Sequence, residues 1–230
     1  MKKTLKMTAI VLSVLSFPAL TGLAHAANPG AYAGLGLGAS ILETPKQQLF
    51  QQNNNPHSAA SYSRGGLGGR VFGGYNYNQY LGVEAGYSRY ANSKYKGISA
   101  SKLPNGSTKN SSINYSMSAF DLVGKGYLPI GESNFNVYGL AGAAYVKSTT
   151  QYKNGKVALD SKVTAPADGS KTNSKVRPII GAGASYNIPQ TSVVTNVEYS
   201  HIQGSGNVRT SPSAIPSADL LTLNVAYNFG

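Results

Sequence analysis

Residues 79–90 read QYLGVEAGYSRY and place a carboxylate in the middle of an alternating pattern. Every second residue from Leu81 to Tyr87 is apolar, and glycine or Glu84 stands between them. A period of two predicts a β-strand whose two faces differ in polarity. In a soluble sheet the apolar face is the core and the polar face meets water, so Glu84 would be solvated. The chain has only eight acidic residues, which makes a mid-strand carboxylate among glycines informative.

The first 26 residues have the parts of a bacterial secretory signal peptide. MKKTLK is basic, residues 10–15 are apolar, and residues 24–26 form an A-x-A cleavage site. The apolar run is too short for a membrane-spanning helix. We therefore expect residues 1–26 to be cleaved on export and residues 27–230 to form the folded domain.

The composition of residues 27–230 limits the folds that are possible. No later apolar run reaches the roughly 20 residues that a membrane helix needs. The chain has no cysteine, which excludes disulfides, thiolate metal sites and a cysteine nucleophile. The folded domain of this exported chain must therefore be stabilised without disulfide bonds.

Seven further stretches are strand-like, and most of them alternate as residues 79–90 do. They are residues 31–40, 66–78, 113–128, 134–148, 175–188, 192–203 and 219–229. The connections alternate between short ones and long ones with loop composition. The long ones are residues 41–65, 91–112, 149–174 and 204–218. This pattern predicts an all-β fold, an eight-stranded antiparallel up-and-down transmembrane β-barrel of the outer membrane.

Tyrosines near the predicted strand ends are typical of the aromatic girdle of such a barrel. They are Tyr75, Tyr77, Tyr80, Tyr90, Tyr127 and Tyr227. The apolar strand faces would then meet lipid, and the polar faces would point inward.

An inward Glu84 would lie in a lumen that eight strands leave just wide enough for side chains. A buried carboxylate there must be paired or neutralised. The inward positions supply charges of both signs, and Arg177 is expected near the barrel end that carries the long connections. We expect one luminal ion-pair network of Arg70, Glu84, Asp121, Lys125 and Glu198.

These motifs, taken in order, resemble a known family. They are GGYNYNQYLGVEAGYSRY (73–90), LVGKGYLPI (122–130), VYGLAGAAYV (137–146), NVEYSHIQG (196–204) and the aromatic ending LTLNVAYNFG (221–230). The chain resembles the eight-stranded transmembrane domain of OmpA-like outer-membrane proteins, including opacity-type surface proteins. The resemblance implies that Glu84 and Glu198, in the third and seventh strands, face the lumen and pair with basic residues. Because the sequence ends at Gly230, we expect neither a peptidoglycan-binding domain nor cell-wall anchoring.

The positive charge is concentrated in two regions. The chain carries +12, or +9 without Lys2, Lys3 and Lys6, and residues 89–112 and 147–177 each carry +5. The candidate basic loop surface is Lys94, Lys96, Lys102, Lys109, Lys153, Lys156, Lys171 and Lys175. Such loops attract phosphates and acidic glycans, and lipopolysaccharide is the nearest partner of this kind. The lysines either solvate the loops and neutralise the lipid surface, or bind host or other anionic glycans.

Other activities have little support in the sequence. No nucleic-acid-binding motif is present, and aromatic residues are sparse in the basic regions. His201 lies in EYSHIQGSGN, where a nearby serine would resemble lipid A deacylases, but Ser200 and Ser205 have the wrong spacing. His57 stands alone in a polar segment, and the two histidines are too far apart for a metal site. We expect no enzyme, no metal and no cofactor.

The sequence therefore predicts an integral bacterial outer-membrane protein, monomeric, in contact with outer-membrane lipid and lipopolysaccharide. Its termini would be periplasmic and its four long loops extracellular. We expect a structural role in the envelope, with interaction or adhesion through the loops. Two alternatives stay open: a narrow ion-conducting pore with a constriction at Glu84, Lys125 and Glu198, and a soluble periplasmic β-barrel.

Overall fold

The structure is a computed structural model in which strands dominate. It describes residues 28–44, 50–52, 55–57, 61–102, 108–131, 133–153, 157–159, 163–165, 169–206 and 214–230. The signal peptide predicted for residues 1–26 lies outside these ranges. Within them, no helix is long and apolar enough to cross a membrane.

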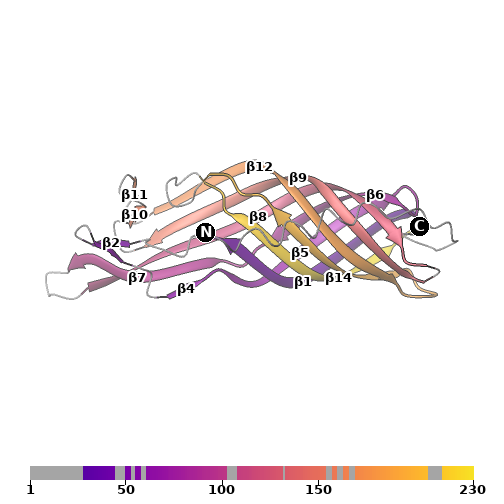
Figure 1. Ribbon diagram of the computed structural model, residues 1–230, viewed down its shortest axis with the longest axis horizontal. Helices are drawn as coiled ribbons and strands as arrows, with labels where there is room; N and C mark the ends of the chain where they lie inside the picture. Colours follow the sequence, from indigo (N-terminus) through magenta and orange to yellow (C-terminus); the bar gives the residue numbers. More distant parts are fainter. Residues whose placement is uncertain are drawn as a thin grey trace.

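Eight long strands close into an antiparallel barrel (Figure 1). They are β1 (Gly30–Glu43), β5 (Gly65–Asn76), β6 (Leu81–Arg89), β8 (Thr108–Pro129), β9 (Phe135–Lys153), β12 (Gly169–Asn187), β13 (Val193–Ile202) and β14 (Ser217–Asn228). Each strand pairs with the next in this order, and β14 pairs with β1 to complete the ring. The predicted eight-stranded barrel is confirmed.

The two ends of the barrel differ. At one end, which we call the turn end, short connections join β5 to β6, β8 to β9 and β12 to β13. Gly30 and Gly230 also lie there, so close that a Cβ on Gly30 would come within 2.8 Å of the Gly230 Cα. The long connections are at the opposite end, which we call the loop end.

Several strands continue past the closed ring at the loop end. β7 (Ser93–Lys102) pairs with the first part of β8, and β4 (Ser61–Ser63) pairs with β7; both lie on the left in Figure 1. The pairings of β8 with β9 and of β9 with β12 also reach this extension. Two small hairpins, β2 (Phe50–Gln52) with β3 (Asn55–His57) and β10 (Val157–Leu159) with β11 (Val163–Ala165), complete the strands.

The prediction that residues 91–112 and 149–174 are loops was therefore wrong for much of their length. Their Ser, Thr and Asn content is typical of loops, but each region also carries a tyrosine, Tyr95 in the first and Tyr152 in the second. Tyr95, Ile113, Tyr115 and Tyr152 are all buried in the extension. Burial of these side chains outweighs the low strand preference of the residues around them.

Alternation along each strand separates two faces. Outward positions carry exposed apolar side chains: Leu35, Leu37, Leu67, Val71, Leu81, Leu122, Leu221, Leu223 and Val225. A band of this kind faces lipid in a transmembrane barrel. Tyr75, Tyr77, Tyr80 and Tyr227 are also exposed, as expected of girdle residues. Tyr90 and Tyr127 are buried inside instead, because they share the parity of Ser88 and Lys125, so the girdle prediction was wrong for these two.

Candidate functional site

The inward faces bring together the five charged residues singled out in the sequence. Arg70 comes from β5, Glu84 from β6, Asp121 and Lys125 from β8, and Glu198 from β13. Each is between 1% and 4% exposed. Three carboxylates and two cations therefore share one buried volume, with a formal sum of −1.

Arg70 contacts all three carboxylates, and Lys125 contacts two of them. Arg70 Nη2 lies 2.9 Å from Glu84 Oε1 and 2.6 Å from Asp121 Oδ1, and Arg70 Nη1 donates to Glu198 Oε1. Lys125 Nζ lies 2.7 Å from Glu84 Oε2 and 2.9 Å from Glu198 Oε2. Glu84 and Glu198 each bridge both cations. Such contacts offset the large desolvation cost of burying charge.

Aromatic side chains complete the network on its turn-end side. The Tyr32 hydroxyl donates to Glu84 Oε2 at 2.9 Å, and the Tyr138 hydroxyl donates to Glu198 Oε2 at 2.9 Å. Lys125 Nζ also lies 4.8 Å from the centroid of the Tyr138 ring, a cation–π contact. The luminal charges are thus held by hydroxyl groups as well as by one another.

A glycine beside the network makes room for a long side chain. A Cβ added to Gly86 would lie 2.6 Å from Arg70 Nη2 and 2.7 Å from Arg70 Nε. Real Cβ atoms do not approach other atoms so closely. The guanidinium therefore occupies the volume that an alanine side chain at position 86 would need.

Two further layers occupy the lumen above and below the charges. Towards the turn end, Asn224 Nδ2 donates to Asn196 Oδ1 at 2.6 Å, and Asn76 and Asn228 donate to the Asn28 carbonyl at 3.1 and 3.0 Å. Towards the loop end the buried side chains are mostly apolar: Leu42, Tyr90, Met117, Ile202, Ile215 and Leu220. The described side chains therefore fill the lumen in an amide layer, a charged layer and an apolar layer.

A barrel with this lumen and an apolar outer band can be compared with known proteins. The family model described as the OmpA-like transmembrane domain matches residues 26–230. The chain belongs to this family. It is an integral protein of the bacterial outer membrane, and its outward band lies in lipid.

The relatives of this OmpA-like barrel match different fractions of this chain and of their own length. An uncharacterized protein of Coxiella burnetii (strain RSA 493 / Nine Mile phase I) is 31% identical over 76% of this chain and 73% of its own. Outer membrane protein A of Klebsiella aerogenes is 28% identical over 98% of this chain but only 56% of its own length. The chain thus spans about half the length of such OmpA relatives.

Among solved structures, the crystal structure of Neisserial surface protein A matches with a TM-score of 0.53 and 12% identity. The match covers 87% of this chain and 97% of that one. At this identity the match shows the fold alone, and the fold is a small outer-membrane barrel.

The predicted basic residues lie at the loop end, on strands more than in loops. Lys94 and Lys96 are exposed on β7, Lys153 is exposed on β9, and Lys171 and Lys175 are exposed on β12. Lys102 and Lys109 belong to β7 and β8, but their side chains lie outside the described part, as does Lys156 altogether. The assignment of Lys94, Lys96, Lys153 and Lys171 to loops was wrong for the reason given above: buried alternate residues extend the strands.

The remaining sequence candidates lie apart from the lumen. Arg177 donates from Nε to the Gln203 carbonyl at 2.8 Å and from Nη2 to the Gly204 carbonyl at 2.5 Å, so it holds a connection at the loop end. His57 belongs to β3. Within the described ranges, no group of three or more histidine and carboxylate side chains is placed to hold a metal ion.

Pattern reasoning on single strands missed one polar cluster on the outer wall. His201 Nδ1 lies 2.8 Å from Asp219 Oδ1, and the Tyr199 hydroxyl donates to the same oxygen at 2.6 Å. The strand register pairs His201 with Asp219 directly. Only the register between β13 and β14 could have revealed this pairing, because the two residues belong to different motifs.

Proposed function

We propose that this OmpA-like barrel is a surface protein of the bacterial envelope that binds anionic glycans through its loop end. The observation that carries the proposal is the set of exposed lysines on the paired strands of the loop-end extension, with Lys94 and Lys96 on one face and Lys171 and Lys175 on the other. In this proposal the loop end faces the exterior and the chain ends face the periplasm. Outer-membrane barrels have short periplasmic turns and longer extracellular loops, which supports this orientation.

The extension gives the lysines fixed positions. Lys94 pairs with Asn114 and Lys96 with Ser112 across β7 and β8, and Lys171 pairs with Thr150 across β12 and β9. Residues two apart on one strand point to the same face, so Lys94 and Lys96 form a short cationic row. A fixed row attracts a regularly sulfated or carboxylated polymer and loses less conformational entropy on binding than flexible loops would.

The test is binding of the refolded protein in neutral detergent to immobilised heparin, used as a sulfated probe. Replacement of Lys94, Lys96, Lys171 and Lys175 by glutamine should weaken binding at least about tenfold, at about 1 kcal/mol or less per exposed charge pair. The lysine-to-arginine variant at the same positions is the matched control and should keep its affinity. Binding by the parent should fall as salt rises. Equal affinity of the glutamine variant and the parent would reject the proposal.

Ion conduction is the second candidate function, and the charged luminal layer is the observation that favours it. In the described conformation the three filled layers would block ions, so opening would need the Glu84 and Glu198 contacts to rearrange. Discrete conductance steps in a planar bilayer that change in Glu84→Gln would support a pore. An inserted protein that passes no current would favour the surface role.

A further inference from the structure

The outer wall carries a second set of cations that the luminal network does not use. β6, β8 and β9 lie side by side, and the register aligns their outward residues into rows across the three strands. One row is Arg89, Ser118 and Lys147. The next row towards the turn end is Tyr87, Phe120 and Tyr145, which are 46%, 55% and 54% exposed.

The rows follow the order of layers in a membrane. Beyond the aromatic row, towards the middle of the barrel, the aligned outward residues are Ala85, Leu122 and Ala143. The wall therefore changes from aliphatic to aromatic to cationic over three rows. Aromatic rings concentrate at the interface between hydrocarbon and headgroups. The cationic row then lies at the level of lipid phosphates.

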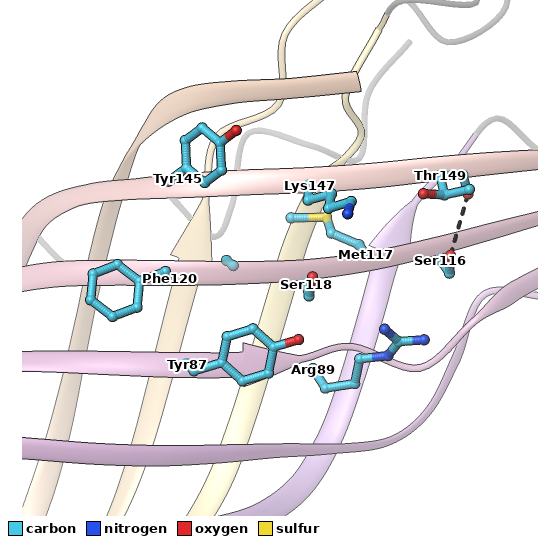
Figure 2. A pocket seen from close by; sticks show the side chains of 10 residues that line it. Tyr87, Arg89, Ser116, Met117, Ser118, Phe120, Tyr145, Lys147 and Thr149 are labelled. Atoms are coloured by element: carbon cyan, nitrogen blue, oxygen red, sulfur yellow. Dashed lines mark hydrogen bonds between the residues drawn. The ribbon is translucent and has the colours of Figure 1, made fainter. Parts of the chain in front are cut away.

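The side chains of the cationic and aromatic rows border a hollow on the wall with a volume of about 410 Å³. Figure 2 shows how they lie around it. Arg89 and Tyr87 stand on the β6 side, and Lys147 and Tyr145 stand on the β9 side. Between them β8 contributes the small side chain of Ser118, and Ser116 donates to the Thr149 carbonyl at 3.4 Å. Because adjacent strands are about 4.8 Å apart, Arg89 and Lys147 are separated by about 10 Å at their backbones. That gap, floored by a serine, can admit a phosphate group between two cations.

In the part of the chain that the structure describes, no carboxylate forms an ion pair with either of these two cations. Among the described residues the ion pairs join Arg70 and Lys125 to luminal carboxylates, and His201 to Asp219. None of them involves Arg89 or Lys147, which are both exposed. A cation at the edge of the hydrocarbon band needs a counter-charge from its surroundings.

The outward residues on the opposite side of the barrel are more acidic. Counting around the ring, β14 is opposite β8. There the outward residues nearest the loop end include Asp219 on β14, Glu43 on β1 and His201 on β13. Anionic lipid would be repelled from that side and attracted to the side formed by β6, β8 and β9.

We infer that the hollow between β6 and β9 is a binding site for one phosphate-bearing lipid of the surrounding leaflet. Arg89 and Lys147 hold the phosphate, the Ser118 hydroxyl donates to it, and Tyr87, Phe120 and Tyr145 pack against the first part of its acyl chains. The aromatic row selects a lipid over free phosphate, since a free ion would leave those rings without a partner. The proposed function supplies only the orientation, and with it the choice of the outer leaflet.

The experiment is native mass spectrometry of the refolded chain in neutral detergent, titrated with bis-phosphorylated lipid A. Arg89→Gln with Lys147→Gln should raise the dissociation constant of the first bound lipid at least about tenfold, at about fivefold per basic residue. Lipid A stripped of its phosphates should bind the parent and the variant equally. Inorganic phosphate at the lipid concentration should not displace lipid A.

Control variants test whether the effect on lipid A binding is specific to the charges of Arg89 and Lys147. Lys153→Gln removes an exposed lysine from the same face of β9, outside the hollow, and should bind as the parent does. Arg89→Lys with Lys147→Arg keeps both charges and should keep most of the affinity. A folded glutamine variant, checked by circular dichroism, that binds lipid A as tightly as the parent would overturn the inference. Displacement by inorganic phosphate would also overturn it, because the site would then be a simple anion site.

The lysine variants of the glycan surface should leave lipid A binding unchanged. Failure of the heparin test therefore leaves this inference standing, and failure of the lipid test leaves the proposed function standing.

Discussion

Arg70 and Arg89 lie on neighbouring strands at almost the same level of the barrel, yet their environments are opposite. In the register of β5 and β6, Arg70 pairs with Ser88, and Arg89 pairs with Gly69. A shift of one residue therefore carries the guanidinium from the lumen to the outer wall. Arg70 contacts three carboxylates, whereas Arg89 has no ion pair within the described part of the chain.

The difference shows that charges on the luminal face and on the outer face of the barrel wall are neutralised in different ways. The luminal charges are almost fully buried, so each charge there must find its partner within the protein. The outer wall meets a membrane whose headgroups carry charge, so a cation at that level can take its partner from the lipid. Loss of a luminal charge should therefore lower the stability of the fold. Loss of the unpaired outer cation should instead weaken the binding of lipid.

The largest effect is expected when the internal arginine is neutralised. Arg70→Gln leaves Glu84, Asp121 and Glu198 with Lys125 as their one cation in the network. Breaking a buried ion pair by removing one partner costs about 3–5 kcal/mol. Urea unfolding in lipid vesicles should show a loss of free energy of that size. A loss below about 1 kcal/mol would mean that water or rearrangement neutralises the carboxylates, and that the lumen is not closed.

Neutralising a bridging carboxylate should have a smaller effect. Glu84→Gln keeps the shape of the side chain and can still accept from Tyr32, but it weakens the contacts to Arg70 and Lys125. Hydrogen bonds to charged groups contribute about 1.5–3 kcal/mol, so we expect a loss of about 3 kcal/mol at most. The same unfolding measurement checks it, with Arg70→Gln as the reference. A loss equal to that of Arg70→Gln would show that the two residues act as one unit.

Crowding Arg70 should lower the free energy of unfolding by a still smaller amount. Gly86→Ala places a methyl group 2.6 Å from Arg70 Nη2, so the guanidinium must move. Overpacking costs about 1–3 kcal/mol, and we expect about 2 kcal/mol in the free energy of unfolding. Gly139→Ala is the matched control, because a Cβ at Gly139 would meet no atom within 4 Å. Equal stability of the two variants would show that Arg70 is not held as described.

The sequence predicted the inner half of this comparison better than the outer half. Alternation assigned Arg70, Glu84 and Glu198 to the inward faces, since parity within one strand is a local property. Parity was not used to place Arg89, which entered only the charge count of residues 89–112. Parity did not reveal the row with Ser118 and Lys147, because that row depends on the register of three strands. The strand extension at the loop end was missed because its polar composition concealed buried Tyr95 and Tyr152.

The smallest effect is expected at the outward arginine. Arg89→Gln removes the same charge as Arg70→Gln, but it breaks no ion pair within the described residues. Substitutions at exposed positions of this kind usually change stability by about 0.5 kcal/mol or less. Unfolding in vesicles of an uncharged lipid without phosphate should therefore give the parent value. In vesicles that contain a phosphate-bearing anionic lipid, the parent should gain stability that the variant lacks, because a ligand that binds the folded state stabilises it. If Arg89→Gln destabilised the barrel by several kcal/mol in both lipids, Arg89 would have a partner inside the protein, and the contrast between the two arginines would be lost.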